Sequence, residues 1–357
     1  MTEQTFATQS WSSTSATDEV LLEVKNVNTQ FFLQQGVVRA VNGVDFTVNR
    51  GQTIGLVGES GCGKSVLARS ILRIVPPPGR ITEGEILFHQ RSGGPGSVGE
   101  EVIDLVKLNE NGSQVRKIRG GEISMVFQEP MTSLSPVHTI ANQIIEAITL
   151  HQDVSKEEAR RLAIDMLDRV NMPQPERTID RYPHQLSGGM RQRAMIAMAL
   201  SCRPALLIAD EPTTALDVTT QAQILTLMRD LQNEFGMAII FITHDLGVIA
   251  QMVDYVVVMY LGEVVEAASV DEIFYEPKHP YTQALLRSIP RLGRKSAEGI
   301  TGKLTAIRGT VPDPYSIPTG CPFHPRCRQM IKGVCDVKTP PFLELEGDHK
   351  VRCVLYE

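Results

Sequence analysis

The segment GESGCGKS, residues 58–65, has the residue types and spacing of a loop that binds phosphate groups. It follows the apolar run TIGLV and precedes VLARSILRIV, so we expect a buried strand, a glycine-rich turn and the start of a helix. The glycines allow backbone N–H groups to converge on phosphate oxygens, and the helix N-terminus adds a partial positive charge. Lys64 is expected to reach the β- and γ-phosphates of a nucleotide, and Ser65 to ligate Mg²⁺. The nucleotide-binding residues predicted here are Gly58, Glu59, Ser60, Gly61, Cys62, Gly63, Lys64, Ser65 and Val66.

An acidic pair at the end of the apolar run LLIADE is the second element with chemical capacity. Asp210 can complete the coordination of the magnesium ion, and Glu211 can polarise the water that attacks the terminal phosphate. Two adjacent carboxylates can also form a solvated turn. Their place after a buried strand, in a chain that carries a phosphate loop, favours catalysis.

The residues around these motifs alternate between strand and helix patterns. From Val20 onward, LLEVKNVNTQFF and VVRAVNGVDFTV predict a twisted, partly antiparallel sheet, in which the glycine-rich residues 89–101 are expected to form a loop insertion. Residues 133–201 have helical periodicity, and Ser155 and Glu158 are placed to form a capping box. The buried-strand runs ALLIAD and MAIIFITHD flank a helical segment, which predicts a parallel α/β core.

The composition is ordinary for a globular protein with room for one large domain and an appendage. The chain is 42% hydrophobic and 21% charged, and its net charge of −6 argues against a nucleic-acid partner. No apolar run approaches the roughly eighteen residues that a membrane span needs. Residues 1–19 have no basic segment followed by an apolar one, so we expect a flexible polar tail, no secretory signal and a reducing cytoplasm.

Four of the six cysteines, Cys321, Cys327, Cys335 and Cys353, follow a Gly- and Pro-rich linker that begins near residue 293. In a reducing compartment, clustered cysteines bind metal more often than they form disulfides, although disulfides and free thiols stay open. The gaps of five, seven and seventeen residues are wider than in common zinc and ferredoxin motifs, so the spacing does not select the metal. Cys62 lies close to a helix N-terminus, which would lower its thiol pKa; the simpler interpretation is a small side chain without a chemical role.

Together these motifs resemble the nucleotide-binding subunit of ABC transporters, over about residues 20–290. The most specific element is LSGGMRQR, residues 186–193, which looks like the signature of that family. The resemblance implies ATP and Mg²⁺ as cofactors. It also implies that Ser187, Gly188 and Gly189 open a helix and bind a phosphate of the nucleotide held by a second subunit.

Other positions match the family one by one. Gln128 in VFQEP resembles the glutamine that senses magnesium and water, and Asp217 in TALD resembles the aspartate that crosses the dimer interface. His244 in ITHD resembles the histidine that contacts the γ-phosphate. An aromatic, Phe31 or its neighbour Phe32, lies where family members stack on adenine, although packing in the core explains it equally. The implied catalytic residues are Lys64, Gln128, Glu211 and His244, and the implied magnesium ligands are Ser65, Gln128 and Asp210.

The end of the chain resembles the ATPases of oligopeptide and dipeptide importers, through EPKHPYTQALLRSIPRL at 276–292 and the cysteines that follow. Some of those ATPases hold a [4Fe-4S] cluster on four cysteines in a similar layout. The resemblance therefore implies a cluster on Cys321, Cys327, Cys335 and Cys353, with zinc as the second choice. We expect a structural role for it, because a small appendage has little core of its own.

The resemblance implies an ATPase that energises import of oligopeptides or dipeptides from the cytoplasmic face of the cell membrane. The implied partners are a second, paralogous ATPase subunit, two membrane permeases that dock near residues 129–140, and an external substrate-binding protein. The alternatives are the same machine carrying oligosaccharides or nickel chelates, and a soluble ABC ATPase outside transport.

The expected fold is of the α/β class, a P-loop ABC-type nucleotide-binding domain with a small cysteine-rich C-terminal extension. We assign residues 1–19 to the tail, 20–290 to the ATPase domain and 291–357 to the extension. Within the ATPase domain we expect a parallel α/β core, an antiparallel β subdomain, and a helical subdomain at about 133–201.

Overall fold

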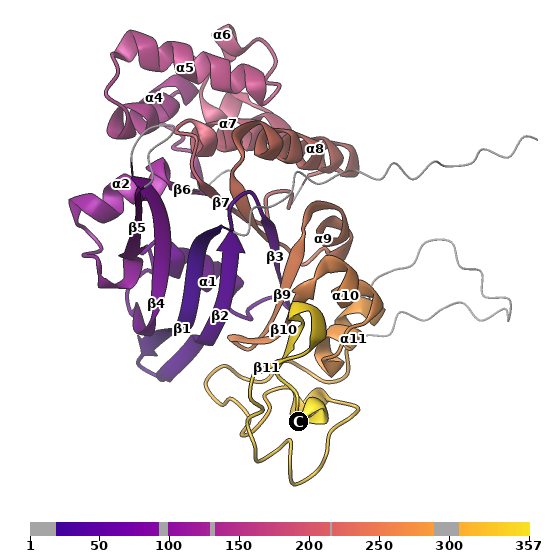
Figure 1. Ribbon diagram of the computed structural model, residues 1–357. Coiled ribbons are helices and arrows are strands. Elements are labelled where there is room, and N and C mark those ends of the chain that lie inside the picture. Colours follow the sequence, from indigo (N-terminus) through magenta and orange to yellow (C-terminus); the bar gives the residue numbers. More distant parts are fainter. Residues whose placement is uncertain (1–18, 93–98, 129–132, 215, 289–306) are drawn as a thin grey trace, which may run out of the picture.

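The computed structural model describes residues 19–92, 99–128, 133–214, 216–288 and 307–357. Residues 1–18 of the predicted polar tail and much of the predicted linker therefore lie outside the described residues. Figure 1 shows a helical layer at the top, an antiparallel sheet at the left, and the C-terminal segment at the bottom.

The antiparallel sheet has the strand order β2-β1-β4-β5. Its strands are β1 (Val20–Leu33), β2 (Gly36–Asn49), β4 (Gly79–Ser92) and β5 (Gly99–Asp104).

The loop insertion expected at residues 89–101 is wrong for most of that segment. His89 pairs with Val102 and Ser92 with Gly99 in the β4–β5 ladder, so a hairpin takes the place of the loop up to the undescribed residues 93–98. The physical reason for the strand pairing is a set of cross-strand side-chain contacts, which the glycine-rich composition does not indicate. The His89 ring contacts Glu100 at 3.2 Å and Glu23 of β1 at 3.0 Å, which links three strands.

The second sheet has the order β11-β12-β10-β9-β3-β8-β7-β6, and its strands from β9 to β6 run parallel. The parallel strands are β3 (Thr53–Val57), β6 (Ile123–Val126), β7 (Leu206–Asp210), β8 (Ala238–Ile242) and β9 (Tyr255–Tyr260). Every residue of β3, β6, β7 and β8 is buried, as expected for strands that are covered on both faces. The predicted parallel α/β core is present.

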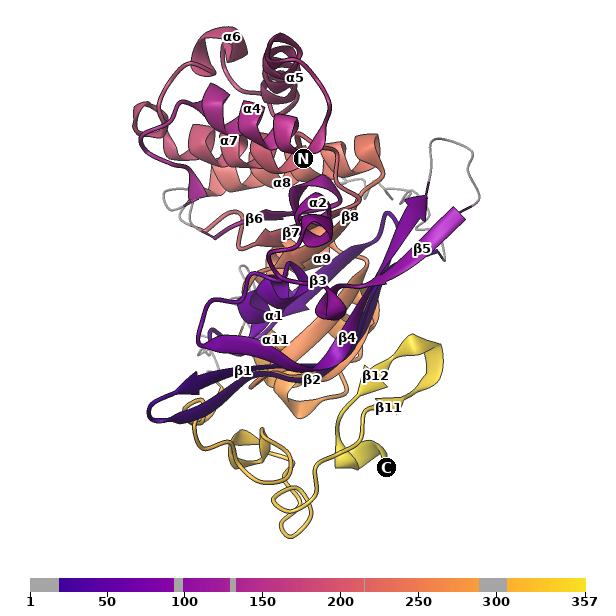
Figure 2. The same ribbon diagram turned by 90° about the vertical axis from the view of Figure 1, so that its left-hand side faces the viewer.

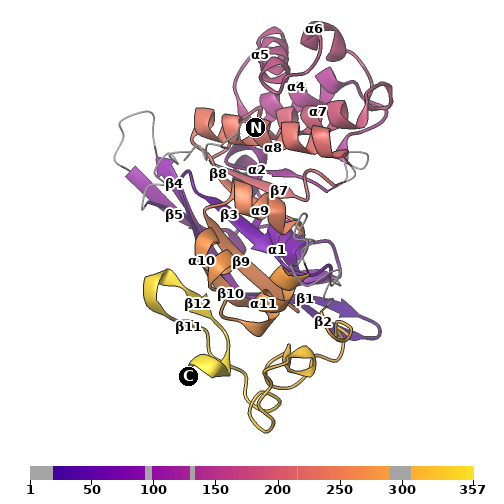
Figure 3. The same cartoon turned by 90° about the vertical axis from the view of Figure 1, so that its right-hand side faces the viewer.

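The alternation along these strands divides the core into two layers. In β7, Leu206 and Ile208 pack with the antiparallel sheet, whereas Leu207 and Ala209 pack with the helical layer. The longer helices are α1 (Lys64–Ile71), α2 (Ser113–Gly121), α4 (Ile140–His151), α5 (Lys156–Arg169), α7 (Gly188–Leu200), α8 (Val218–Phe235) and α11 (Pro280–Arg287). The shorter ones are α6 (Pro175–Thr178), α9 (Leu246–Met252) and α10 (Val270–Tyr275). Helices α4 to α7 form the upper layer in all three ribbon views (Figures 1 to 3).

The C-terminal segment returns to the main sheet. Strand β12 (Lys350–Val351) pairs with β10 (Glu263–Ser269), and β11 (Leu343–Glu344) pairs with β12. Figures 2 and 3 show this yellow hairpin below the β4–β5 edge, next to β10. The buried carboxylate of Glu266 contacts His349 Nε2 at 2.8 Å and accepts backbone N–H groups at the start of α11, so one acid ties three segments together.

None of the helices in the described part of the chain is long and apolar enough to span a bilayer.

The cap of α5 shows one half of the predicted capping box. Ser155 accepts the N–H of Glu158 at 3.2 Å, as expected. The Glu158 carboxylate does not reach back to the cap, because it binds the Arg161 guanidinium at 2.6 and 3.1 Å instead. The one-sided cap satisfies a backbone donor, whereas the ion pair is exposed to solvent.

We therefore predict that Ser155→Ala lowers the free energy of unfolding by about 1 kcal/mol, through the loss of the α5 cap. The matched control Glu158→Ala is expected to change it by less than about 0.5 kcal/mol, because an exposed pair contributes little. Urea unfolding followed by circular dichroism measures both. Equal losses in the two variants would contradict this assignment.

Candidate nucleotide and catalytic site

The predicted site residues follow four neighbouring parallel strands. The phosphate loop follows β3, His244 comes shortly after β8, the acidic pair ends β7, and Gln128 comes shortly after β6. Because the carboxyl ends of parallel strands meet at one edge of a sheet, the topology alone gathers these groups into one crevice.

The backbone of the phosphate loop requires glycine at two positions. Gly58 has a φ of 151°, and a Cβ there would lie 2.2 Å from the carbonyl oxygen of Met259. Gly63 has a φ of 105°, and a Cβ there would lie 2.1 Å from the carbonyl oxygen of Ala40. The loop therefore packs directly on the backbone of β9 and β2, and α1 begins at the next residue.

Lys64 is buried at the base of this loop. Its ammonium group donates to the carbonyl oxygens of Gly58 at 2.8 Å and Glu59 at 3.1 Å. These two contacts hold the positive charge inside the curl where a phosphate is expected.

The lowered thiol pKa predicted for Cys62 is wrong. The side chain is 4% exposed, and burial raises its pKa even though Lys64 lies nearby and opposes the shift. Loss of solvation outweighs the helix N-terminus here, because the thiol is packed in the core beneath the phosphate loop, where its sulfur lies 3.6 Å from the Lys64 ammonium. The simpler interpretation of Cys62 as a small packed side chain agrees with this placement.

Asp210 is almost fully buried at the end of β7 and receives a hydrogen bond from the Ser65 hydroxyl. Burial raises its pKa, with Ser65 opposing the shift. Its Oδ1 atom has no hydrogen-bond partner among the described residues. A buried carboxylate oxygen without a partner, beside a hydroxyl, has the donor set that Mg²⁺ prefers, so these two residues fit the implied ion.

The Glu211 carboxylate collects three polar side chains. Gln128 Nε2 and Thr214 Oγ1 each donate to it at 2.9 Å, and His244 Nδ1 lies 3.2 Å from its other oxygen. Although burial opposes ionisation, the hydrogen bonds from Thr214 and His244 keep its pKa below the usual range. The structure thus brings Gln128, Glu211 and His244 together as one polar group, and it adds Thr214, which the sequence reasoning missed.

The residues predicted to contact a second subunit are not part of the polar group around Glu211. Ser187 caps α7 by accepting the N–H of Met190 at 3.3 Å, and Ser187 and Gly188 are exposed. Helix α7 lies in the upper layer, apart from α1 (Figure 1). Asp217 is exposed and caps α8 through Thr220. Their predicted contacts with a second subunit stay predictions.

The aromatic predicted to stack on adenine lies in β1. Phe31 is half-buried, and its ring covers Gly79 so closely that a Cβ there would lie 2.5 Å from it. Its neighbour Phe32 is 38% exposed, with the Arg80 guanidinium 4.3 Å from the ring centre. Stacking on a base also stays a prediction.

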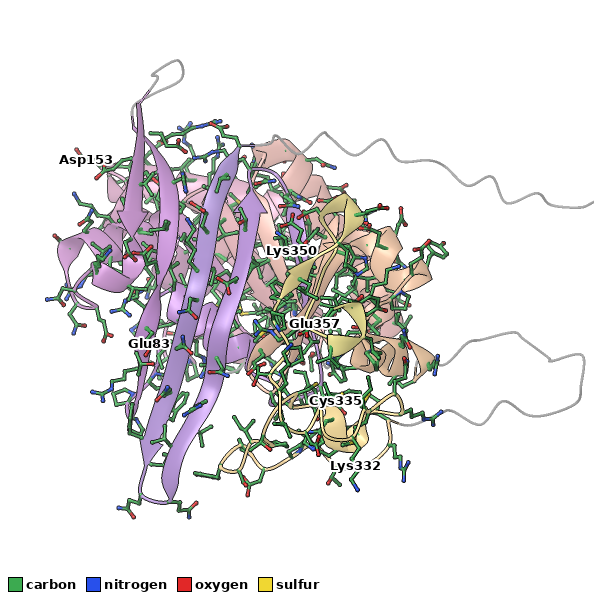
Figure 4. All side chains as sticks on the ribbon, turned by 60° about the horizontal axis from the view of Figure 1, so that its bottom comes forward. Glu83, Asp153, Lys332, Cys335, Lys350 and Glu357 are labelled. Carbon is green, nitrogen blue, oxygen red and sulfur yellow. The ribbon has the colours of Figure 1, made fainter. Side chains whose placement is uncertain are left out.

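The four C-terminal cysteines line one small cavity and form no disulfide. Backbone N–H groups donate to two of the sulfurs, Gln329 to Cys327 and Ile331 to Cys335, at 3.3 Å each. In the described residues, no three Cys, His, Asp or Glu side chains are close enough to form a metal-ligand group as they stand. Figure 4 shows Cys335 within the yellow C-terminal segment, outside the sheets. The structure therefore gathers the four thiols in one place, but their sulfurs do not form a metal-ligand group.

Glu59 was predicted to bind nucleotide, and the structure gives its side chain a different partner. Its carboxylate pairs with both terminal nitrogens of Arg326, at 2.6 and 2.9 Å, and its N–H donates to the Tyr281 hydroxyl at 2.9 Å. The sequence reasoning missed Arg326 and Tyr281. The only available signal was their place inside the motifs CPFHPRC and HPY.

Comparison with known proteins assigns this site. Residues 41–214 match the family model described as ABC transporter, and residues 265–335 match the one described as oligopeptide/dipeptide transporter, C-terminal region. A dimeric structure of the ATP-binding cassette MJ0796 in a post-hydrolysis state, bound to ADP and Pi, superposes with a TM-score of 0.60 at 27% identity, over 70% of this chain and 99% of that one. The expected fold class is confirmed, and the protein is an ATPase of the ABC type.

Two relatives from Bacillus subtilis (strain 168) narrow the assignment. The oligopeptide transport ATP-binding protein AppD is 50% identical over 337 residues, which make up 94% of this chain and 97% of AppD. The dipeptide transport ATP-binding protein DppD is 46% identical over 340 residues, 95% of this chain and 96% of DppD. The chain belongs to the ATP-binding subunits of the oligopeptide/dipeptide transporter family.

We predict that Glu211→Gln lowers the rate of ATP hydrolysis by roughly 100-fold or more, because the amide cannot accept a proton from water. Binding of a fluorescent ATP analogue is expected to stay within about threefold, since the amide preserves the shape of the site. The exposed Glu157→Gln serves as the control and should hydrolyse ATP normally. Hydrolysis that persists in the Glu211 variant would refute the catalytic assignment.

Proposed function

We propose that this chain hydrolyses ATP to drive import of oligopeptides or dipeptides, as a peripheral subunit on the cytoplasmic face of the cell membrane. The observation that carries the proposal is the C-terminal region at 265–335, which matches a family named for this cargo. The ATP site by itself does not select a cargo, because the same fold serves many tasks. Full-length similarity to AppD and DppD, named for oligopeptide and dipeptide transport, supports the same conclusion.

In this proposal the nucleotide phosphates lie in the loop at residues 58–63, where Lys64 neutralises their charge. Glu211 accepts a proton from the attacking water, since its lowered pKa keeps it ionised. Gln128 and His244 orient that carboxylate through their contacts with it, and His244 also faces the terminal phosphate. Catalysis then comes from positioning and charge, without a covalent intermediate.

Ser65 and Asp210 are the residues that would hold the magnesium ion, with Gln128 next to it. When bound, the ion neutralises charge on the phosphate oxygens. The pairing of Asp210 with Ser65 supports this role, because it brings the Ser65 hydroxyl of α1 against the carboxylate at the end of β7.

The proposed assembly includes a second ATPase subunit, two permeases and an external binding protein. Two observations support a dimer: the signature residues Ser187 and Gly188 are exposed, and the MJ0796 cassette is dimeric. A permease would contact the upper layer, where Val137 and Leu150 are exposed, each more than 70%. Part of the docking segment proposed at 129–140 lies outside the described residues.

The transporter, purified with its permeases and binding protein in lipid discs, tests the cargo. We expect peptides of two to several residues to stimulate ATP hydrolysis several-fold over the basal rate. Delivered cargo should favour the conformation of the transporter in which the two ATPase subunits come together around ATP. Oligosaccharides and nickel chelates are the controls and should leave the basal rate unchanged. Stimulation by either of them, with none by peptides, would overturn the proposed cargo, and failure of the chain to co-purify with membrane partners would overturn transport.

We further propose that Cys321, Cys327, Cys335 and Cys353 hold a [4Fe-4S] cluster, with zinc as the alternative. The four thiols line one cavity without a disulfide, and N–H groups already point at two of the sulfurs, as around cluster ligands. The thiols must lose their protons and close in on the metal, because burial now raises the pKa of Cys321 to about 12.

Metal analysis of the anaerobically purified chain tests this. We expect about four iron and four sulfide per chain and a brown colour. Cys335→Ser is expected to lose most of the iron, whereas Cys202→Ser, which changes a cysteine outside the cavity, should keep it. Stoichiometric zinc in a colourless sample would contradict the cluster.

A further inference from the structure

Arg326 links the C-terminal region to the phosphate loop. It lies in a short 3-10 helix, His324–Arg326, directly before Cys327, and its backbone is held to Phe323. Its side chain is only 4% exposed. The guanidinium extends from there to the Glu59 carboxylate and forms a two-point pair with it. This geometry uses the planar fork of arginine, which lysine does not have.

The pair is embedded in aromatic packing. Arg326 Nη1 also donates to the Tyr260 hydroxyl at 3.3 Å, and Arg326 Nε donates to the carbonyl oxygen of Arg308 at 3.1 Å. Phe323 packs edge-on against Tyr260 and against Tyr281, with ring centres 5.3 Å apart in both cases. The stability of a buried charge in such surroundings depends strongly on its ion-pair partner. The buried Arg326 guanidinium therefore determines the position of the Glu59 carboxylate.

Glu59 transmits that constraint to Lys64. Three groups of this one residue are held: the carboxylate by Arg326, the N–H by Tyr281, and the carbonyl oxygen by the Lys64 ammonium at 3.1 Å. The carbonyl oxygen of Glu59 is one of the two that aim Lys64 into the loop. A shift of Glu59 would therefore move the charge that is expected to meet the phosphates.

We propose that Arg326 is a positioning residue of the ATP site, which acts through Glu59 on Lys64 and sets the affinity for ATP. This role of Arg326 does not depend on what the four cysteines bind or on which cargo is carried, because it concerns nucleotide affinity alone. The Lys64 charge is expected to meet the phosphates in the ground state as well as in the transition state. A displaced Lys64 should therefore weaken binding of both states alike, which raises KM and leaves kcat nearly unchanged.

The test compares Arg326→Met with the matched control Arg328→Ala, which removes an exposed arginine two residues away. Affinity for a fluorescent ATP analogue is measured on the intact chain, and KM and kcat are measured on the transporter complex. We expect Arg326→Met to raise both Kd and KM roughly tenfold with kcat within about twofold, given the usual strength of a charge-assisted pair. Arg326→Lys should restore part of the affinity, and Arg328→Ala should match the unmodified protein.

Glu59→Gln and the double variant with Arg326→Met show whether the effect passes through this pair. The double variant should raise KM by clearly less than the product of the two single effects, because both changes remove the same interaction. Three results would overturn the proposal: a lowered melting temperature of Arg326→Met with unchanged KM, which marks a purely structural tether; an equal KM effect in Arg328→Ala; or multiplicative effects in the double variant.

Discussion

A single backbone constraint determines where the nucleotide site can form: the turn after β3 must pack against neighbouring backbone without room for a side chain at Gly58 or Gly63. Since the carbonyl oxygens of Met259 and Ala40 fill that space, the loop is anchored to strands on two sides. The buried Lys64 and the first turn of α1 follow directly from this turn. The acidic pair, Gln128 and His244 are then placed relative to it by the order of the parallel strands.

The two adjacent acids, Asp210 and Glu211, have different environments and therefore suit different chemical roles. Asp210 is the last residue of a buried strand, and loss of solvation raises its pKa. Glu211 has a φ of 46°, so the chain turns there and its carboxylate meets three polar side chains that favour the charged form. One peptide bond thus separates an acid that suits a metal ion from an acid that suits a proton acceptor. The strained backbone at Glu211 is what directs them differently.

Local patterns predicted much of this fold and its site. The phosphate loop, the buried strands and the Ser155 cap depend on neighbouring residues, so the sequence reveals them. The β4–β5 hairpin was missed because the glycines suggested a loop, while the His89 contact that ties the hairpin to β1 depends on the distant Glu23. The sequence favoured a small packed side chain at Cys62, but it did not show that burial raises the pKa of this thiol, because that burial depends on packing that spacing does not reveal. Arg326 was missed for a related reason: an arginine between two cysteines has no local sign of a distant partner.

The pairing of Glu59 with Arg326 spans 267 positions of the chain, and its contact with Tyr281 spans 222. Contacts of such high sequence separation cost the most loop-closure entropy and form late in folding. During synthesis from the N-terminus, the glycines of the phosphate loop emerge long before the residues that hold Glu59. The loop therefore lacks the contacts of Glu59 with Tyr281 and Arg326 during much of biosynthesis. The ATP site is complete only when the C-terminal region packs against the loop.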